Sequence, residues 1–229
     1  MKKLMFCYCC VLIMISCSPT MKIAYNTDNL NLLETDKINN ISLSVQFFED
    51  IRSQSENNFL HLTSDLWTVR INNEKSCINS EVLYKKTPVG QQMSTIFAEH
   101  LSKKMPQLIV YFNQKEYADY YLEATVKYFQ GTQKFSTGAA VGAQFGLIGA
   151  LATAGAKTQG TIIIELAEVK VFDKQNNLII SIDNLRKEYE GEFPADANCY
   201  CIYNNMNQKL SEFNDDLISL LLMDMQNIK

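Results

Sequence analysis

Alternating apolar and polar residues predict most of the strands in this chain. Across Ile41–Phe47 every second residue is apolar, which is the period of a strand with one buried face. Similar patterns over 67–71, 108–112 and 120–129 predict three further strands, and residues 53–58 form a polar loop. The folded domain is therefore expected to begin at Ile41.

A hairpin is predicted in the second half of the chain. Residues 161–172 and 178–182 both carry strand patterns, and Asp173–Asn177 between them has the composition of a turn. Within the first of these strands the apolar positions change from even to odd numbers. Such a change of phase indicates a β-bulge, which we place near Ala167–Glu168.

Two amphipathic helices are predicted from apolar residues at three- and four-residue steps. The first begins at Thr87-Pro88, with threonine as N-cap and proline at the first helical position, and runs to about Lys104. The second opens at Pro194-Ala-Asp196, and its apolar positions are Ile202, Met206, Leu210, Phe213, Leu217 and Leu220. Strands and helices in this order predict a single α+β domain over 41–229. We expect two layers, a mostly antiparallel sheet with both helices packed on one face.

The amino terminus has the three-part layout of a secretory signal. Two lysines, Lys2 and Lys3, precede the uncharged apolar run Leu4–Ile15, and the small residue Ser16 precedes Cys17. The apolar run is about a dozen residues long, whereas a membrane-spanning helix needs about 20. We therefore expect residues 1–16 to be a signal peptide and not a stable membrane span.

Met14–Cys17 resembles a lipobox, in which an aliphatic residue, a free position and a small residue precede a lipidated cysteine. Cys17 would carry a thioether diacylglycerol and an amide-linked acyl chain such as palmitate, the only non-protein groups expected. Each buried methylene contributes about 0.8 kcal/mol, so two or three chains give stable anchoring. The residue after the cysteine is Ser18 and not Asp, which favours the outer membrane, at its periplasmic face. The alternative is an ordinary secretory signal with an incidental cysteine.

Residues 17–40 are rich in Asn, Asp and Thr and are expected to form a flexible tether between lipid and domain. The formal net charge of the chain is −4, which gives no support to a nucleic-acid partner.

Three of the seven cysteines would leave with the signal peptide and a fourth would be lipidated. In an oxidising periplasm, the remaining Cys77 is expected to pair with either Cys199 or Cys201. Cys199 and Cys201 stand two residues apart, which is not the spacing of a Cys-x-x-Cys redox pair. A structural disulfide or buried free thiols are favoured over a metal site.

A Gly/Ala-rich insertion occupies 136–160. Its glycines Gly138, Gly142 and Gly146 repeat every four residues, with Gly149 following, and no charge lies between Lys134 and Lys157. Such spacing allows close helix approach in a membrane, and about 19 helical residues would span about 28 Å against a hydrocarbon core of about 30 Å. The segment is thus a candidate for membrane insertion or homo-oligomerisation, and the alternative is a connection between two strands.

The sequence does not favour an enzyme. The two histidines, His61 and His100, fall on a predicted polar loop and a helix, so neither a metal-binding cluster nor a Ser-His-Asp arrangement is indicated. The sequence contains no Gly-x-Ser-x-Gly elbow, P-loop or dinucleotide fingerprint. We expect no catalytic residue, metal or cofactor.

Several short features resemble YajG-like and ABC-transport auxiliary lipoproteins, with a broader similarity to curli-secretion-type lipoproteins. These are Asp50 and Arg52 after the first strand, a helix beginning near Pro88, and Ala118–Glu123 entering a strand, followed by a hairpin and a final helix. The resemblance implies a non-catalytic component of an envelope assembly or transport complex, with other envelope proteins as partners. Asp50 and Arg52 are expected to form a structural salt bridge, with ligand binding as the alternative. Two other functions stay open, a carrier of a lipid or other apolar ligand and an envelope hydrolase.

Overall fold

The computed structural model describes residues 23–33, 41–52, 60–63, 66–71, 88–136, 157–194 and 200–225. Within them, five short strands precede or flank the first helix: β1 (Ser42–Val45), β2 (Glu49–Asp50), β3 (Leu60–Thr63), β4 (Leu66–Ile71) and β5 (Ile109–Phe112). Three strands of 17 residues each follow, namely β6 (Tyr120–Ser136), β7 (Lys157–Asp173) and β8 (Leu178–Pro194). The helices are α2 (Val89–Lys104), the 3₁₀ turn η3 (Lys115–Tyr117) and α5 (Tyr200–Met225).

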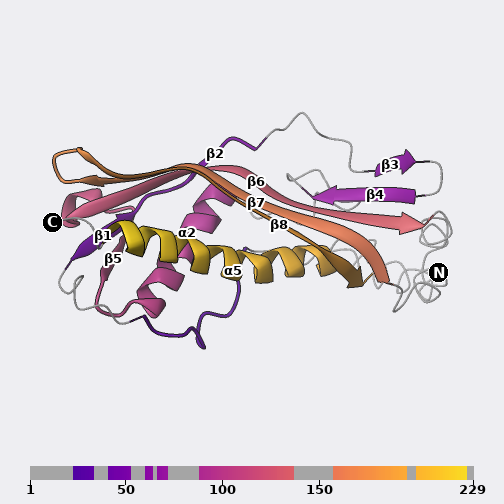
Figure 1. Ribbon diagram of the computed structural model, residues 1–229, viewed down its shortest axis with the longest axis horizontal. Coiled ribbons are helices and arrows are strands. Elements are labelled where there is room, and N and C mark those ends of the chain that lie inside the picture. Colours follow the sequence, from indigo (N-terminus) through magenta and orange to yellow (C-terminus); the bar gives the residue numbers. More distant parts are fainter. Residues whose placement is uncertain are drawn as a thin grey trace, which may run out of the picture.

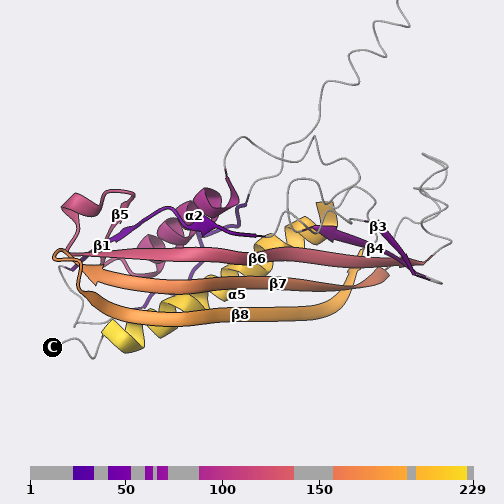
Figure 2. The ribbon, with the colours of Figure 1, turned by 90° about the horizontal axis from the view of Figure 1, so that it is seen from above.

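These strands form one sheet around β6. One edge of β6 pairs in succession with β1, β2 and β4, and the other edge pairs along its length with β7, which pairs in turn with β8. The pairs of β1 with β5 and β6 and of β2 with β6 are parallel, and the others are antiparallel. Figure 1 and Figure 2 show both helices on one face of this sheet. The predicted two-layer α+β fold is confirmed.

The bulge predicted in the first hairpin strand is present at Glu168. The residues before it that face the helices have even numbers (Ile162, Ile164, Leu166), those after it have odd numbers (Val169, Val171), and all five are buried. The register of β7 against β6 shifts at this point, between Glu123 and Thr125 of β6. Glu168 itself has a φ of 51°, a conformation that L-residues rarely adopt.

The positive φ of Glu168 predicts the effect of a glycine substitution at this position. Glu168→Gly is expected to stabilise the fold by up to about 1 kcal/mol, because glycine adopts positive φ without a steric penalty. The matched control is Glu123→Gly in β6, where φ is ordinary and glycine is expected to cost about 0.5–1 kcal/mol. Urea denaturation of both variants measures the difference. Equal destabilisation by the two substitutions would contradict the positive φ at Glu168.

Several element boundaries differ from those predicted. β6 and β8 extend to Ser136 and Pro194, well beyond residues 129 and 182. Pro194 is the last residue of β8 and does not open the final helix, which begins at Tyr200. The first helix has Pro88 as its N-cap, one residue later than expected.

Glycines interrupt the apolar alternation of β6 and β7, so the predicted strands are shorter than the observed ones. On β6, a Cβ atom at Gly131 would lie 2.7 Å from Ile202 Cγ1 and 2.7 Å from Met206 Sδ of α5. On β7, a Cβ at Gly160 would lie 2.6 Å from the Phe193 ring. Glycines therefore occupy inward-facing positions where the sequence pattern calls for an apolar residue, since the helix and the Phe193 ring leave no room for a side chain.

Candidate functional site

An extended segment of residues 23–33 lies along the two helices, and Figure 1 shows it in indigo. The Ile23 N–H donates to Gln92 Oε1 (3.0 Å), and the Leu33 N–H donates to the Lys104 carbonyl (2.8 Å). Ile23 and Thr27 are buried. The expectation of a flexible tether over 17–40 is therefore wrong for residues 23–33, because this segment buries side chains and forms long-range hydrogen bonds.

The docked segment is held by a chain of polar groups between the helices. Asn214 Nδ2 donates to Tyr25 Oη (2.6 Å), and Tyr25 Oη lies 2.5 Å from His100 Nδ1. His100 Nε2 lies 2.9 Å from Asp215 Oδ1, which also accepts a hydrogen bond from Lys104 Nζ. His100 is fully buried, so its two ring nitrogens are satisfied within the protein.

These contacts determine which group donates and which accepts in each hydrogen bond of the network. Because the Asn214 amide donates to Tyr25 Oη, the tyrosine proton is free to point at His100 Nδ1, and the proton on Nε2 then points at Asp215. Burial lowers the pKa of His100 and raises the pKa of Tyr25. Both shifts favour the neutral side chains that this order requires.

A second cluster holds the segment at the neighbouring positions of the same turns of α2, Glu99 and Lys103. Thr27 Oγ1 donates to Glu99 Oε1 (2.7 Å), and Lys103 Nζ lies 2.8 Å from Thr27 Oγ1 and 2.9 Å from Asp28 Oδ1. The hydroxyl of Thr27 is the main cause of a lowered pKa at Glu99. These ion pairs are exposed, so their contribution to stability is small and they chiefly fix the position of the segment.

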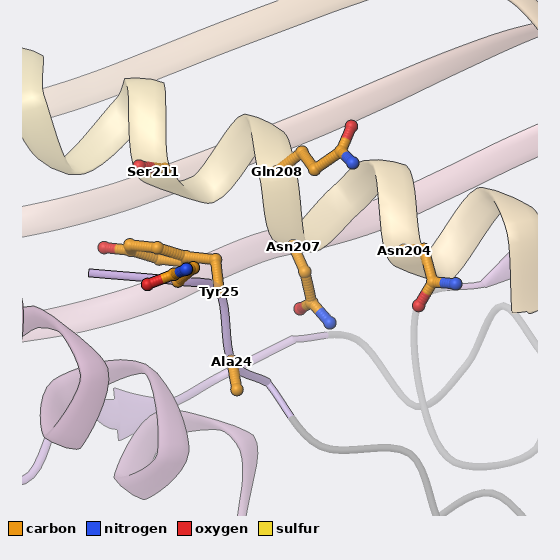
Figure 3. A pocket seen from close by; sticks show the side chains of 7 residues that line it. Ala24, Tyr25, Asn204, Asn207, Gln208 and Ser211 are labelled. Atoms are coloured by element: carbon orange, nitrogen blue, oxygen red, sulfur yellow. The ribbon is translucent and has the colours of Figure 1, made fainter. Parts of the chain in front are cut away.

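An open groove of about 520 Å³ lies between this segment and α5 (Figure 3). Its lining is Ala24, Tyr25, Asn26, Asn204, Asn207, Gln208 and Ser211. None of these side chains is charged, and the amides both donate and accept hydrogen bonds. The groove suits a neutral polar partner better than a charged or purely apolar one.

The structure also describes three other features considered in the sequence: the Asp50–Arg52 pair, His61 and His100. Arg52 Nε and Nη2 each lie 2.8 Å from a different oxygen of Asp50, which confirms the expected salt bridge. The backbone of His61 lies in β3 and not in a loop, which corrects that prediction. The polar network around His100 was missed by sequence reasoning, and the only signal for it is the alternation of Ile23, Tyr25 and Thr27.

Several predictions lie outside the described residues. They are the signal peptide 1–16, the lipid site Cys17, the polar loop 53–58, the cysteines Cys77 and Cys199, and the glycines Gly138, Gly142, Gly146 and Gly149. Cys201 is in α5, and its side chain is not described. Within the described ranges, no group of three or more His, Cys, Asp or Glu side chains could hold a metal ion. No helix among the described residues is long and apolar enough to cross a membrane.

The His100 network predicts a specific loss of stability in mild acid. Because the pKa of His100 is lowered on folding, the unfolded chain binds more protons below about pH 6.5, and stability falls as the pH decreases from there. Asp119, whose pKa the Ser42 hydroxyl lowers to about 2, acts only below about pH 4. His100→Gln should remove the pH dependence of stability that begins below about pH 6.5 and leave the dependence that Asp119 causes at lower pH. Urea denaturation at several pH values tests this, and an unchanged slope in the variant would contradict it.

Comparison with known proteins gives structural matches only. No family model matches the chain, and no curated protein matches its sequence. A crystal structure of a Xanthomonas campestris protein of the DUF330 family is 11% identical, with a TM-score of 0.44, and the match covers 87% of this chain and 95% of that one. A crystal structure of an uncharacterized protein is 13% identical, with a TM-score of 0.42 and coverage of 88% and 97%. We draw no functional conclusion from similarity at this level, and the resemblance to YajG-like lipoproteins stays a prediction.

Proposed function

We propose that this chain is a lipoprotein anchored by Cys17 at the periplasmic face of the bacterial outer membrane. Its α+β domain serves as a non-catalytic binding or assembly component of a cell-envelope complex. The observation that carries the proposal is the short distance along the chain between the lipobox-like Met14–Cys17 and the docked segment that begins at Ile23.

Chain length sets how far the domain can stand from its anchor. Only residues 18–22 separate Cys17 from Ile23. At about 3.6 Å per residue, this connection spans at most about 22 Å. The domain is therefore held beside the membrane, which suits a component that presents a surface to other proteins there.

The polar chemistry of the described residues supports binding more than catalysis. The histidine in the network, His100, is fully buried and is enclosed by Tyr25 and Asp215. It is not placed to exchange a proton with a substrate. The groove beside Tyr25 presents neutral amides instead, a lining that favours recognition of a polar partner over transport of an apolar ligand.

Replacement of the anchoring cysteine tests the first part of the proposal. Cys17→Ala should move the protein from the membrane fraction to the soluble fraction, because the acyl chains can no longer be attached. Ser18→Ala is the matched control and should stay with the membrane. Membrane attachment of Cys17→Ala equal to that of the control would contradict the anchor.

Gentle detergent extraction tests the second part. The full-length protein is purified with and without residues 138–156, sized, and examined by mass spectrometry for companions. We expect large assemblies that contain other envelope proteins. A monodisperse monomer that brings only a lipid with it would contradict the assembly role and favour a carrier.

A further inference from the structure

We propose that the groove between the docked segment and α5 binds a neutral oligosaccharide that carries N-acetylamino groups. The inference rests on the proposed role of the domain as a binding component, and it names the chemistry of what is bound. Every residue of the lining lies within the described parts of the chain, either in residues 24–26 or in α5.

One side of α5 carries neutral polar side chains where the helix borders the groove. The four positions are spaced by three and four residues, so they share one side of the helix: Asn204, Asn207, Gln208 and Ser211. Asparagine and serine are less favourable in a helix than alanine, lysine or glutamate. Helix stability therefore does not account for this set of residues, whereas recognition of a polar ligand does.

The groove has a buried floor and an exposed rim. The side of Asn207 is buried, with 7% exposure, and Tyr25 is half-buried, whereas Asn204 and Gln208 are exposed. Figure 3 shows Asn204 and Asn207 extending from α5 toward the side on which Ala24 lies. The volume of about 520 Å³ falls within the range of about 300–1,000 Å³ that is usual for small-ligand sites. The groove can therefore hold a ligand of a few sugar rings.

Tyr25 offers its ring to the groove, because its hydroxyl is already occupied. Tyr25 Oη accepts a hydrogen bond from Asn214 Nδ2 (2.6 Å) and lies 2.5 Å from His100 Nδ1. These two contacts hold the ring in place before a ligand arrives, which lowers the entropic cost of binding. Beside Ala24 the ring supplies an apolar surface, on which the C–H face of a pyranose ring can pack.

The charged residues between the groove positions of α5 have partners elsewhere. Lys209 Nζ lies 2.7 Å from Glu212 Oε1 and 5.0 Å from the centre of the Tyr189 ring in β8. Phosphate and carboxylate ligands are typically bound by arginine or lysine, and the lining contains neither. An extended peptide is read through pockets for its alternate side chains. A lining of amides and a serine favours instead a neutral ligand that is dense in polar groups.

Sugar hydroxyls and acetamido groups match this lining. A hydroxyl both donates and accepts hydrogen bonds, as do the amides of asparagine and glutamine. An acetamido group presents one N–H and one C=O, and a primary amide has the complementary acceptor and donor. The same chemistry occurs in the glycan of the cell wall and in free oligosaccharides, which the experiment below distinguishes.

Titration calorimetry with chitotriose, the trimer of N-acetylglucosamine, tests the inference. The full-length lipoprotein is kept in a polyoxyethylene detergent, because a detergent with a sugar headgroup would compete for the groove. The test variant is Asn204→Ala/Gln208→Ala, which removes two exposed amides of the rim. The matched control is Gln175→Ala/Asn184→Ala, which removes two exposed amides from the β7–β8 hairpin. Cellotriose, which has no acetamido group, is titrated into the parent protein.

We expect saturable binding of chitotriose at one site per chain, and several-fold weaker binding of cellotriose. Binding of chitotriose should be about tenfold weaker in the Asn204→Ala/Gln208→Ala variant, because two hydrogen-bonding groups are lost, and unchanged in the control. Absence of binding, equal binding of the two sugars, or equal binding by the two variants would overturn the inference. A protein that does not bind chitotriose but still copurifies with other envelope proteins would leave the proposed function in place.

Sedimentation with purified cell-wall sacculi distinguishes the two sources of the ligand. Parent protein that pellets with the sacculi and is released by chitotriose binds the glycan of the wall. Parent protein that binds chitotriose but stays in solution takes a free oligosaccharide.

Discussion

Phe213→Ala is expected to lower the free energy of unfolding by about 3–5 kcal/mol, the range for truncating a fully buried phenylalanine. Phe213 is completely buried in α5, within the apolar cluster that joins this helix to the sheet. Its side chain is among the largest of the fully buried ones, so its removal leaves a cavity that the long β6–β8 strands cannot readily close.

Urea denaturation measures this loss against Gln208→Ala, an exposed position on the same helix. The control is expected to change stability by about 0.5 kcal/mol or less. Similar losses in both variants would mean that α5 is not packed on the sheet through the face that contains Phe213.

Gly90→Ala is expected to destabilise the protein by about 3 kcal/mol, although alanine normally stabilises a helix by about 1 kcal/mol relative to glycine. A Cβ atom at Gly90 would lie 2.2 Å from the Phe48 carbonyl oxygen. Because that atom belongs to the backbone, it cannot rotate away, and α2 must shift from the sheet. The sign of the effect is therefore opposite to the one that helix propensity predicts.

The control for Gly90→Ala is Thr95→Ala on the exposed face of α2, which should change stability by about 0.5 kcal/mol or less. Thermal or urea denaturation serves for both. A Gly90→Ala protein as stable as the parent would contradict the close contact between α2 and the β1–β2 connection.

The fold was predictable where one physical rule governs a stretch of sequence. The periodic apolar residues of α5 and the change of phase at Glu168 each reflect burial on one face, which the sequence shows directly. The ends of β6 and β8 were not predictable, because Gly131 and the charged residues of β8 interrupt the apolar pattern. There the strands continue because their neighbours pair with them.

The polar network around His100 could not be predicted from the sequence, for a different reason. Tyr25 and His100 are 75 residues apart, and His100 and Asp215 are 115 apart, so no local spacing connects them. The segment that carries Tyr25 has the polar composition of a linker, yet Ile23 and Thr27 are buried and Tyr25 is half-buried. Composition alone cannot distinguish a tether from an extended segment that docks on a surface formed elsewhere in the chain.

The most direct test of the lipid anchor is the mass of the mature amino-terminal peptide, measured on protein from the membrane fraction. We predict a chain that begins at Cys17 and carries a diacylglyceryl thioether and an amide-linked acyl chain. A mature protein that begins at another residue, or that has an unmodified Cys17, would contradict the lipid anchor.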